Sequence, residues 1–394
     1  MSSLVYLDLS TIVTLERSYK RDPKRFSEFV ARWQEAECVL ALSFVHFLEI
    51  AGSVHADSRN ARVRVLQALE PTRMDLIPSG GAPSALQQLA GREVFAALGR
   101  IAGQESRLAS MDRHWTAFPT SVPDGATGAL LRTLTSRDHR RIYAEFRKAS
   151  ETEASARSRS TNSKHLQTRL RDLPSGGFDP EHAASARAWL GTFLESDQWK
   201  ADLATTIAPE SRDEVERFVR EWIEQTFEEM LTAGAREVFA RRLEADFPEA
   251  LKRRTDELIS RHVFRQIVED TVVSVLKVTD PPTVMKLVDS VLLEDCPGTW
   301  LRFAVERELR SARTKWEAGA TYDLLHLSHL PYVNVMFTDR EIADNTRKVR
   351  QRVGVPPAVA QAPAPISVAA SLDEVEHVIR SLPRTPDDRK SEPG

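Results

Sequence analysis

A short apolar segment between two helical patterns constrains the fold of this chain more than any other feature. Its centre, Tyr332–Phe337, is rich in β-forming residues, follows Pro331 and is closed by Thr338 and Asp339. Strands that are covered on both faces lose the alternation of polar and apolar residues, so the segment predicts a buried strand of a parallel sheet. Apolar residues recur at helical spacing before it (Leu324, Leu325, Leu327, Leu330) and after it (Ile342, Thr346, Val349, Val353).

Two acidic residues flank this predicted strand. Asp323 is expected at the head of the preceding helix, and Asp339 stands at the carboxyl end of the strand. In open α/β sheets, ligands collect outside the carboxyl ends of the strands. Two carboxylates at that edge suggest a cation site.

The beginning of the chain repeats this arrangement. Leu4–Leu7 predicts a strand that Asp8 follows at once, with Ser10 and Thr11 able to cap the next helix. Val39–Leu42 predicts a second strand, and Ser43 is expected to cap a nearly all-apolar helix, Phe44–Ile50, that carries Glu49. Buried carboxylates are rare unless they are paired or bind metal. The acids Asp8, Glu49, Asp323 and Asp339 are therefore expected at one sheet edge.

This order of strands, helices and acids resembles the PIN domain, a family of metal-dependent nucleases. The matching segments are VYLDLSTIV, LSFVHFLEIA, YDLLHLSHLPYVNVMFTDRE and a last strand in ISVAAS. They cover roughly residues 1–78 and 320–384, under half of the chain, and the most specific are the D-x-x-H-L helix and the TDRE end. The resemblance implies a ribonuclease, and an inhibitor or antitoxin protein as a partner. The segment from 79 to about 318 departs from the compact size of the family.

The fold class expected is α/β, a PIN-like parallel sheet flanked by helices with an inserted all-α domain. Residues 1–78 and 320–384 are expected to form the PIN-like domain, residues 79–319 the insertion, and residues 385–394 a disordered tail. Within this scheme Met74–Ile77 and Ile366–Ala370 are further strand candidates. The clearest helices of the insertion are expected at 211–231, 249–277, from Asp280, and at 298–316.

Composition limits the partners and the compartment. The 394 residues carry a net charge of -3, which argues against a broadly basic surface for nucleic acid. The two cysteines have no metal-ligand spacing, and no apolar run is long enough to span a membrane, so a cytoplasmic protein is expected. The most basic portion, residues 132–171, fits either a phosphate-contacting face or a solvated helix with a flexible Ser/Arg-rich loop. The oligomeric state stays open, a homodimer included.

The chemistry follows from clustered carboxylates, which repel one another at neutral pH unless a cation neutralises them. Mg²⁺ prefers oxygen ligands and keeps several waters, which suits a few carboxylates together with a substrate phosphate. Mg²⁺ or Mn²⁺ is therefore the expected cofactor, with Asp8 and Asp323 as central ligands and Asp339 and Glu49 completing the set. Ser10, Thr11 and Thr338 are expected to orient ligands or water, and Arg340 to contact phosphate.

Simpler interpretations of the same residues remain open. Asp8 and Asp339 each have the position of a helix cap, Glu49 could pair with an arginine, and His326 and His46 fit ordinary core histidines. A haloacid-dehalogenase-type phosphatase needs an Asp where this chain has Ser10. A Walker loop, a G-x-G-x-x-G fingerprint and an H-E-x-x-H motif are absent from the sequence. The non-enzymatic alternative is a catalytically silent PIN-like module whose helical insertion binds a protein partner.

Overall fold

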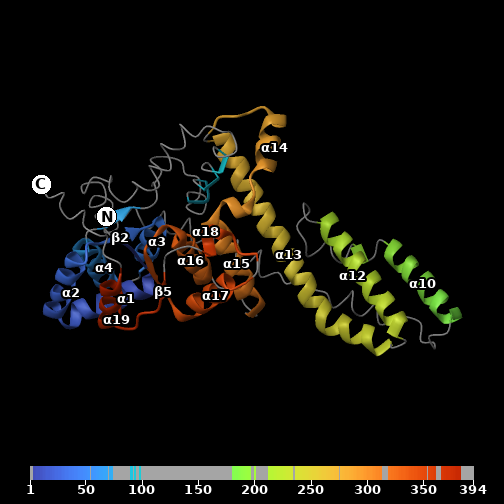
Figure 1. Ribbon diagram of the computed structural model, residues 1–394, viewed down its shortest axis with the longest axis horizontal. Helices are drawn as coiled ribbons and strands as arrows, with labels where there is room; N and C mark the ends of the chain where they lie inside the picture. The colour runs from blue at the N-terminus through green and yellow to red at the C-terminus, as the bar shows by residue number, and fades with distance from the viewer. Residues whose placement is uncertain are drawn as a thin grey trace, which may run out of the picture. The chain divides into compact units, whose positions relative to one another are not determined.

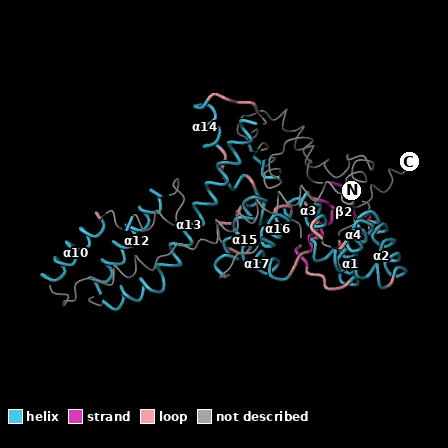
Figure 2. The backbone as a smooth tube through the Cα atoms, turned by 180° about the vertical axis from the view of Figure 1, so that it is seen from behind, coloured by secondary structure: helices cyan, strands magenta, loops and turns pink. Residues whose placement is uncertain are grey.

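A computed structural model of the chain describes the residues that follow (Figures 1 and 2). They are 3–53, 55–69, 71–73, 89–91, 93–94, 97–98, 180–196, 199–200, 212–233, 236–274, 276–312, 318–352, 354–360 and 365–382. These residues form many helices and one small parallel sheet, as the α/β class requires.

The sheet has five strands in the order β3-β2-β1-β4-β5, and all its neighbours are parallel. The strands are β1 (Ser3–Leu7), β2 (Cys38–Leu42), β3 (Thr72–Arg73), β4 (Val335–Phe337) and β5 (Ile366–Ser367). β1 and β4 are adjacent, with Leu7 in register with Phe337. The predicted sheet built from both ends of the chain is confirmed.

The amphipathic helices near the two ends of the chain pack their apolar side chains against the sheet. Val5 and Leu7 of β1, together with Phe337 of β4, belong to a buried cluster that includes apolar residues of α1, α2 and α19. The helices that belong to the two ends of the chain are α1 (Leu9–Arg21), α2 (Pro23–Glu35), α3 (Phe44–Ala51), α4 (Ala56–Ala68), α16 (Ala318–Leu327), α17 (Arg340–Arg350), α18 (Pro357–Ala360) and α19 (Leu372–Ser381), with the 3-10 turn η4 (Leu330–Tyr332). Figures 1 and 2 both show α1, α2 and α4 grouped beside the strands.

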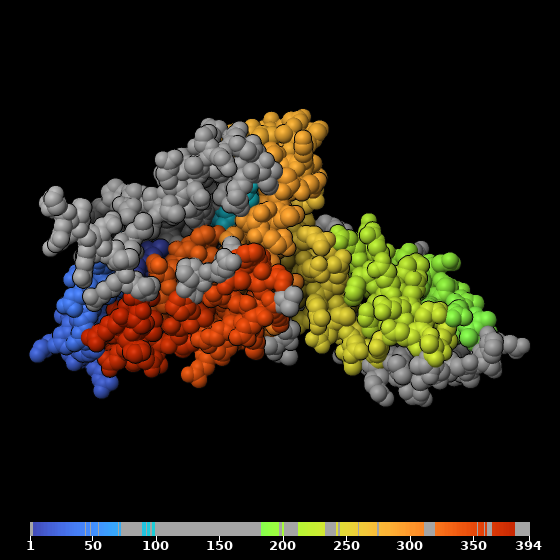
Figure 3. Space-filling view, in the orientation of Figure 1, coloured from blue at the N-terminus to red at the C-terminus, as the bar shows by residue number. Residues whose placement is uncertain are grey.

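Ion pairs tie the two ends of the chain together. The Glu376 carboxylate of α19 accepts hydrogen bonds from Arg25, at 2.7 Å, and from Arg32, at 2.6 and 2.7 Å, both on α2. Glu376 is buried, so these charge-assisted bonds contribute more than a surface pair. Figure 3 shows the blue amino-terminal and red carboxyl-terminal segments packed side by side.

Between β3 and β4 every described element is helical. Before α16 and η4 these elements are α10 (Pro180–Glu195), α12 (Arg212–Ala233), α13 (Arg236–Ser274), α14 (Pro281–Ser290), η3 (Leu293–Asp295) and α15 (Pro297–Ala312). The described residues divide into two compact units. The first contains the sheet, with residues up to 98, 265–309 and from 318 onward, and the second contains residues 180–264 and 310–312. The expected insertion, 79–319, is thus shared between the two units.

The second unit has its own core. Val215, Val219, Ile223 and Phe227 recur at helical spacing along α12 and are fully buried. They belong to one cluster with Leu190 and Leu194 of α10 and with Phe247 and Leu251 of α13.

In the first unit, a buried carboxylate fixes the start of α15. Glu93 accepts hydrogen bonds from the backbone N–H of Gly298 (2.6 Å), the backbone N–H of Thr299 (2.9 Å) and the Thr299 hydroxyl (2.5 Å), and the Tyr332 hydroxyl also donates to it. A glycine is required at 298, because a Cβ there would lie 2.2 Å from the Ser328 carbonyl oxygen.

Several predicted boundaries were wrong. Asp323 does not open its helix, because α16 already begins at Ala318. Ser10 and Thr11 do not cap α1, since Asp8 is the N-cap and they lie inside the helix. α13 begins at Arg236 rather than 249 and continues through Pro248, because Phe247 and Leu251 on either side of that proline are both buried in the second core. The last strand contains only Ile366 and Ser367, and α15 is described to Ala312.

Some predictions fall outside the described residues. They concern the strand at 74–77, the basic segment 132–171 and the tail 385–394. Among the helices that the structure describes, none combines the length and the apolar character needed to cross a membrane.

Candidate active site

Asp8 stands at the carboxyl end of the central strand β1. Its backbone N–H donates to the Phe337 carbonyl of β4 at 3.0 Å, which extends the pairing of the two strands by one residue. Its carboxylate accepts the backbone N–H of Thr11 at 2.9 Å and the Ser10 hydroxyl at 2.8 and 3.0 Å. Asp8 is 4% exposed, so it is a buried acid as well as the N-cap of α1.

Glu49 lies on α3, the helix that follows β2. Its side chain is 10% exposed and its carboxylate is 2.6 Å from Nε2 of His326 on α16. Burial, and after it the negative charge of Asp8, raise the pKa of Glu49 to about 8, against a smaller opposing effect of Arg62.

Asp339 occupies the equivalent position after β4. It is the N-cap of α17, and its Oδ1 accepts the Ile342 backbone N–H at 2.9 Å. Thr338, just before it, is buried and donates its N–H to the Ser367 carbonyl of β5 at 3.0 Å. Arg340 opens α17 with an exposed side chain. Asp8 and Asp339 therefore follow adjacent parallel strands at one edge of the sheet.

Asp323 lies three residues before His326 on α16, which places both on one face of the helix. The chain passes from α16 through η4 into the start of β4, so the amino-terminal half of α16 lies toward the carboxyl edge of the sheet. Asp323 is one helical turn before His326 on that helix. The structure thus places Asp8 and Asp339 after adjacent strands and Glu49 against His326, and it places Asp323 only by its position on α16.

A buried chain of hydrogen bonds leads away from Glu49. His326 Nδ1 is 2.6 Å from the Tyr6 hydroxyl, which is 2.6 Å from the Ser43 hydroxyl. Ser43 in turn contacts His46 Nδ1 through its N–H at 2.9 Å and its hydroxyl at 3.1 Å. His46 Nε2 is 2.6 Å from the Leu7 carbonyl oxygen, and burial holds the pKa of His46 well below its ordinary value. Both histidines are buried and hydrogen-bonded, as an ordinary core histidine requires.

The oxygen atoms of this site meet only part of what a cation such as Mg²⁺ requires. Asp8 and Glu49 are two neighbouring carboxylates, which is the number that Mg²⁺ takes when waters and a phosphate complete its shell. The hydroxyl of Thr11, a buried residue whose N–H donates to Asp8, has no hydrogen-bond partner within the part of the chain that the structure describes. Across the described residues, however, His, Cys, Asp and Glu side chains do not form any group of three or more that could hold a metal ion. Among the described residues, the acids near this edge do not form a complete ligand set.

Sequence reasoning gave Tyr6 no role, treated Ser43 only as a helix cap, and favoured an ordinary core histidine for His326. Tyr6 belongs to an apolar strand, where a tyrosine is ordinary, and it is two residues before Asp8. Side chains two residues apart leave a strand on the same face, and this period could have linked Tyr6 to Asp8.

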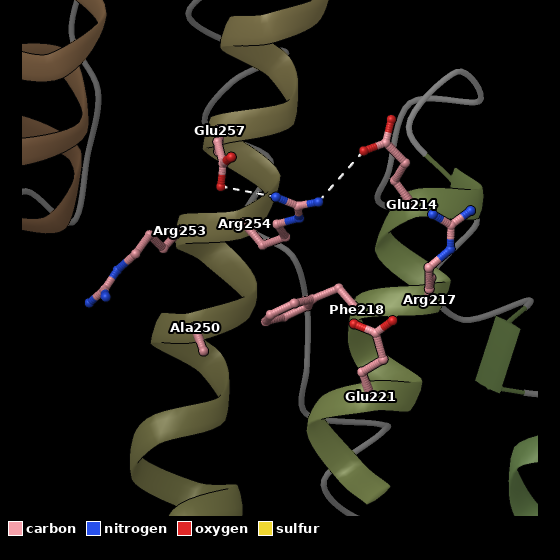
Figure 4. A pocket seen from close by; sticks show the side chains of 8 residues that line it. All are labelled: Glu214, Arg217, Phe218, Glu221, Ala250, Arg253, Arg254 and Glu257. Atoms are coloured by element: carbon pink, nitrogen blue, oxygen red, sulfur yellow. Dashed lines mark ion pairs between the residues drawn. The ribbon is translucent and has the colours of Figure 1, made fainter. Parts of the chain in front are cut away.

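A separate groove lies between α12 and α13 in the second unit (Figure 4). Its lining residues are Glu214, Arg217, Phe218, Glu221, Ala250, Arg253, Arg254 and Glu257. Arg254 pairs with Glu257 at 3.1 Å and with Glu214 at 3.6 Å. Three arginines and three glutamates balance in charge, so the groove favours neither an anionic nor a cationic ligand.

Comparisons with protein-family models, with curated proteins and with solved structures find no match to this chain.

Proposed function

We propose that the chain is a divalent-metal-dependent ribonuclease with a PIN-like α/β core and an inserted helical domain. Asp8 and Glu49 hold Mg²⁺ or Mn²⁺ directly, while Asp323 and Asp339 act from the same edge through water or the substrate phosphate. RNA as the substrate class, and an inhibitor protein as a regulator, rest on the resemblance in sequence.

One observation supports this proposal above the others: Asp8 and Asp339 follow adjacent parallel strands, and the nearly buried Glu49 has a pKa raised by burial and then by the charge of Asp8. Two nearly buried acids that repel each other destabilise the metal-free protein, and a divalent cation between them removes that cost. Their position at the carboxyl ends of parallel strands is where α/β folds bind ligands. When bound, the ion supplies an activated water or stabilises a leaving oxygen.

The residues of the chain have separate tasks in this proposal. Ser10 donates to both oxygens of Asp8 and fixes the orientation of that carboxylate. His326 contacts Glu49 in the same way from the opposite helix. Arg340, exposed at the start of α17, is available to a phosphate at the same edge.

A second candidate is the catalytically silent module whose helical insertion binds a protein partner. It is favoured by the Glu49–His326 hydrogen bond, which already gives Glu49 a partner within the protein. The incomplete ligand set among the described residues favours it as well. The two candidates differ in whether the acids bind a cation.

The deciding experiment measures Mn²⁺ binding by electron paramagnetic resonance and cleavage of a mixed single-stranded and hairpin RNA pool with Mg²⁺, with Mn²⁺ and with EDTA. Asp8→Asn keeps the helix cap, because Asn caps as well as Asp, but removes the charge. We expect it to lose Mn²⁺ affinity and to reduce cleavage by at least about a hundredfold, which matches the loss of a transition-state interaction of roughly 3 kcal/mol.

The matched control is Asp22→Asn. Asp22 is also an N-cap, accepting the Arg25 N–H at 3.0 Å, but it lies at the far end of α1. That helix has 13 residues, so Asp22 is about 20 Å from Asp8. Cleavage that persists in EDTA, or an Asp8→Asn protein as active as the Asp22→Asn control, would overturn the nuclease proposal and favour the silent module.

A further inference from the structure

We propose that Tyr6 and His326 form a positioning relay that fixes the Glu49 carboxylate at the sheet edge. The inference rests on the proposed function, because it assigns Glu49 a part in metal-dependent cleavage. Neither Tyr6 nor His326 touches the substrate in this proposal. Both act through Glu49.

The relay joins three elements that are distant in sequence. Tyr6 is on β1, Glu49 on α3 and His326 on α16. The two hydrogen bonds, from Tyr6 to His326 and from His326 to Glu49, are each 2.6 Å. Tyr6 is wholly buried and His326 is 1% exposed, so water does not compete for either bond. Such buried bonds hold a side chain in one rotamer more firmly than exposed ones.

The rings around Tyr6 leave its hydroxyl little freedom to move. His329 stacks on the Tyr6 ring at 5.1 Å between centroids, and His46 lies at 4.7 Å. His326 meets the ring edge-on at 5.5 Å. The Tyr6 hydroxyl is thus held beside His326 by packing as well as by its hydrogen bonds.

The direction of the hydrogen bonds follows from the state in which Glu49 would hold a metal ion. A metal-bound Glu49 is ionised and can only accept, so Nε2 of His326 carries the proton and donates to it. Nδ1 of a neutral imidazole then accepts, and the Tyr6 hydroxyl donates to it. Ser43 donates its hydroxyl to the Tyr6 oxygen in turn. Tyr6 therefore selects the one tautomer of His326 that can hold an ionised Glu49.

This arrangement resembles the outer-shell support that metal ligands receive in proteins. Partners of this kind orient the ligand, and their removal costs about 10–100-fold in metal affinity or activity. Tyr6→Phe removes only the hydroxyl and keeps the stacked ring. We expect kcat to fall about 10–100-fold with the KM for RNA unchanged, and the Mn²⁺ affinity to fall with it.

Two variants of His326 separate positioning from packing. His326→Gln keeps an N–H that can reach Glu49, whereas His326→Leu fills a similar volume without a donor. We expect Gln to retain more activity than Leu at equal folded content by circular dichroism. Tyr19→Phe is the matched control for Tyr6→Phe, because it removes a tyrosine hydroxyl on α1 that lies outside this network, and we expect a change below about threefold.

A spectroscopic measurement tests the relay without cleavage. Histidine-selective ¹⁵N NMR in alkaline buffer reports which ring nitrogen of His326 carries the proton between Glu49 and Tyr6. We expect an Nε2-protonated ring in the parent protein and a mixture of tautomers in Tyr6→Phe. If the parent neither cleaves RNA nor binds Mn²⁺, the proposed function fails and the tautomer alone decides the positioning role. A ring protonated on Nδ1 in the parent, or a Tyr6→Phe protein with unchanged tautomer and kcat, would overturn the relay.

Discussion

Because the pKa of Glu49 is raised in the folded state, the stability of the metal-free protein should fall as the pH rises, and Glu49→Gln should remove this dependence. The pKa rises from 4.5 to about 8 on folding. Since one pKa unit corresponds to about 1.4 kcal/mol, ionising Glu49 costs the folded protein on the order of 5 kcal/mol. The hydrogen bond from His326 reduces this figure, because a donor favours the ionised carboxylate.

The sign follows from which state holds the proton. Below pH 4.5 Glu49 is protonated in both states, and the stabilising contribution of its proton in the folded protein is fully present. Between pH 4.5 and about 8 the unfolded chain has released that proton while the folded protein still holds it, so stability falls as the pH rises. Above about 8 both states are ionised and the loss is complete. Glu49→Gln keeps the size of the side chain and lacks this loss.

The assay is urea unfolding of parent and Glu49→Gln proteins in EDTA at pH 5 and pH 8. From pH 5 to pH 8 we expect the parent to lose several kcal/mol of unfolding free energy relative to Glu49→Gln. Glu28→Gln, at an exposed position on α2, is the control and should follow the parent. Millimolar Mg²⁺ at pH 8 should restore the parent and leave Glu49→Gln unchanged, by linkage of binding to folding. Parallel pH profiles for parent and Glu49→Gln would refute the reasoning.

Three further predictions concern the pKa of Glu49 and the stability of the helices α10 and α15. Asp8→Asn should lower the pKa of Glu49 toward its ordinary value, measured by ¹³C NMR of the carboxyl carbon, because a repelling charge is removed. Gly298→Ala should destabilise the protein by about 3 kcal/mol or more in denaturant unfolding, since the new Cβ would lie 2.2 Å from the Ser328 carbonyl oxygen. Its control is Gly191→Ala on α10, where a Cβ would meet nothing within 4 Å, and this change should stabilise the protein by about 0.5–1 kcal/mol. Glu93→Gln should cost about 2 kcal/mol or more in the same assay, because an amide cannot accept all the donors that converge on that carboxylate.

The sheet could be predicted because its signals are local. The runs at Leu4–Leu7 and Val333–Phe337 are short, apolar and followed by an acid, and parallel pairing follows from the helices between strands. The pairing of β1 with β4 across more than three hundred residues came from the acids, which need a common edge to share a cation.

The boundaries and the surroundings of the acids could not be predicted, because they depend on tertiary contacts. Nothing local to Asp323 shows that α16 begins five residues earlier, at Ala318. The bond between Glu49 and His326 joins residues 277 positions apart, and no sequence period reports such a contact. Glu93 likewise caps α15 from 205 residues away. A carboxylate that caps a distant helix leaves no local capping pattern of the kind that Asp22 shows before α2.

Asp8 and Asp339 can cap a helix and bind a cation at the same time, although the sequence presents these two roles as alternatives. A capping aspartate offers Oδ1 to a backbone N–H of the first turn, as both residues do here, and the positive end of the helix dipole favours its negative charge. The cap thus fixes a charged carboxylate at the carboxyl edge of the sheet, which is what a cation site requires. Asn performs the first role and lacks the charge for the second. Asp8→Asn should therefore leave the unfolding free energy of the metal-free protein unchanged or higher while cleavage is lost, because relief of the repulsion with Glu49 offsets the lost interaction with the helix dipole. A parallel loss of stability and cleavage would assign Asp8 to capping alone.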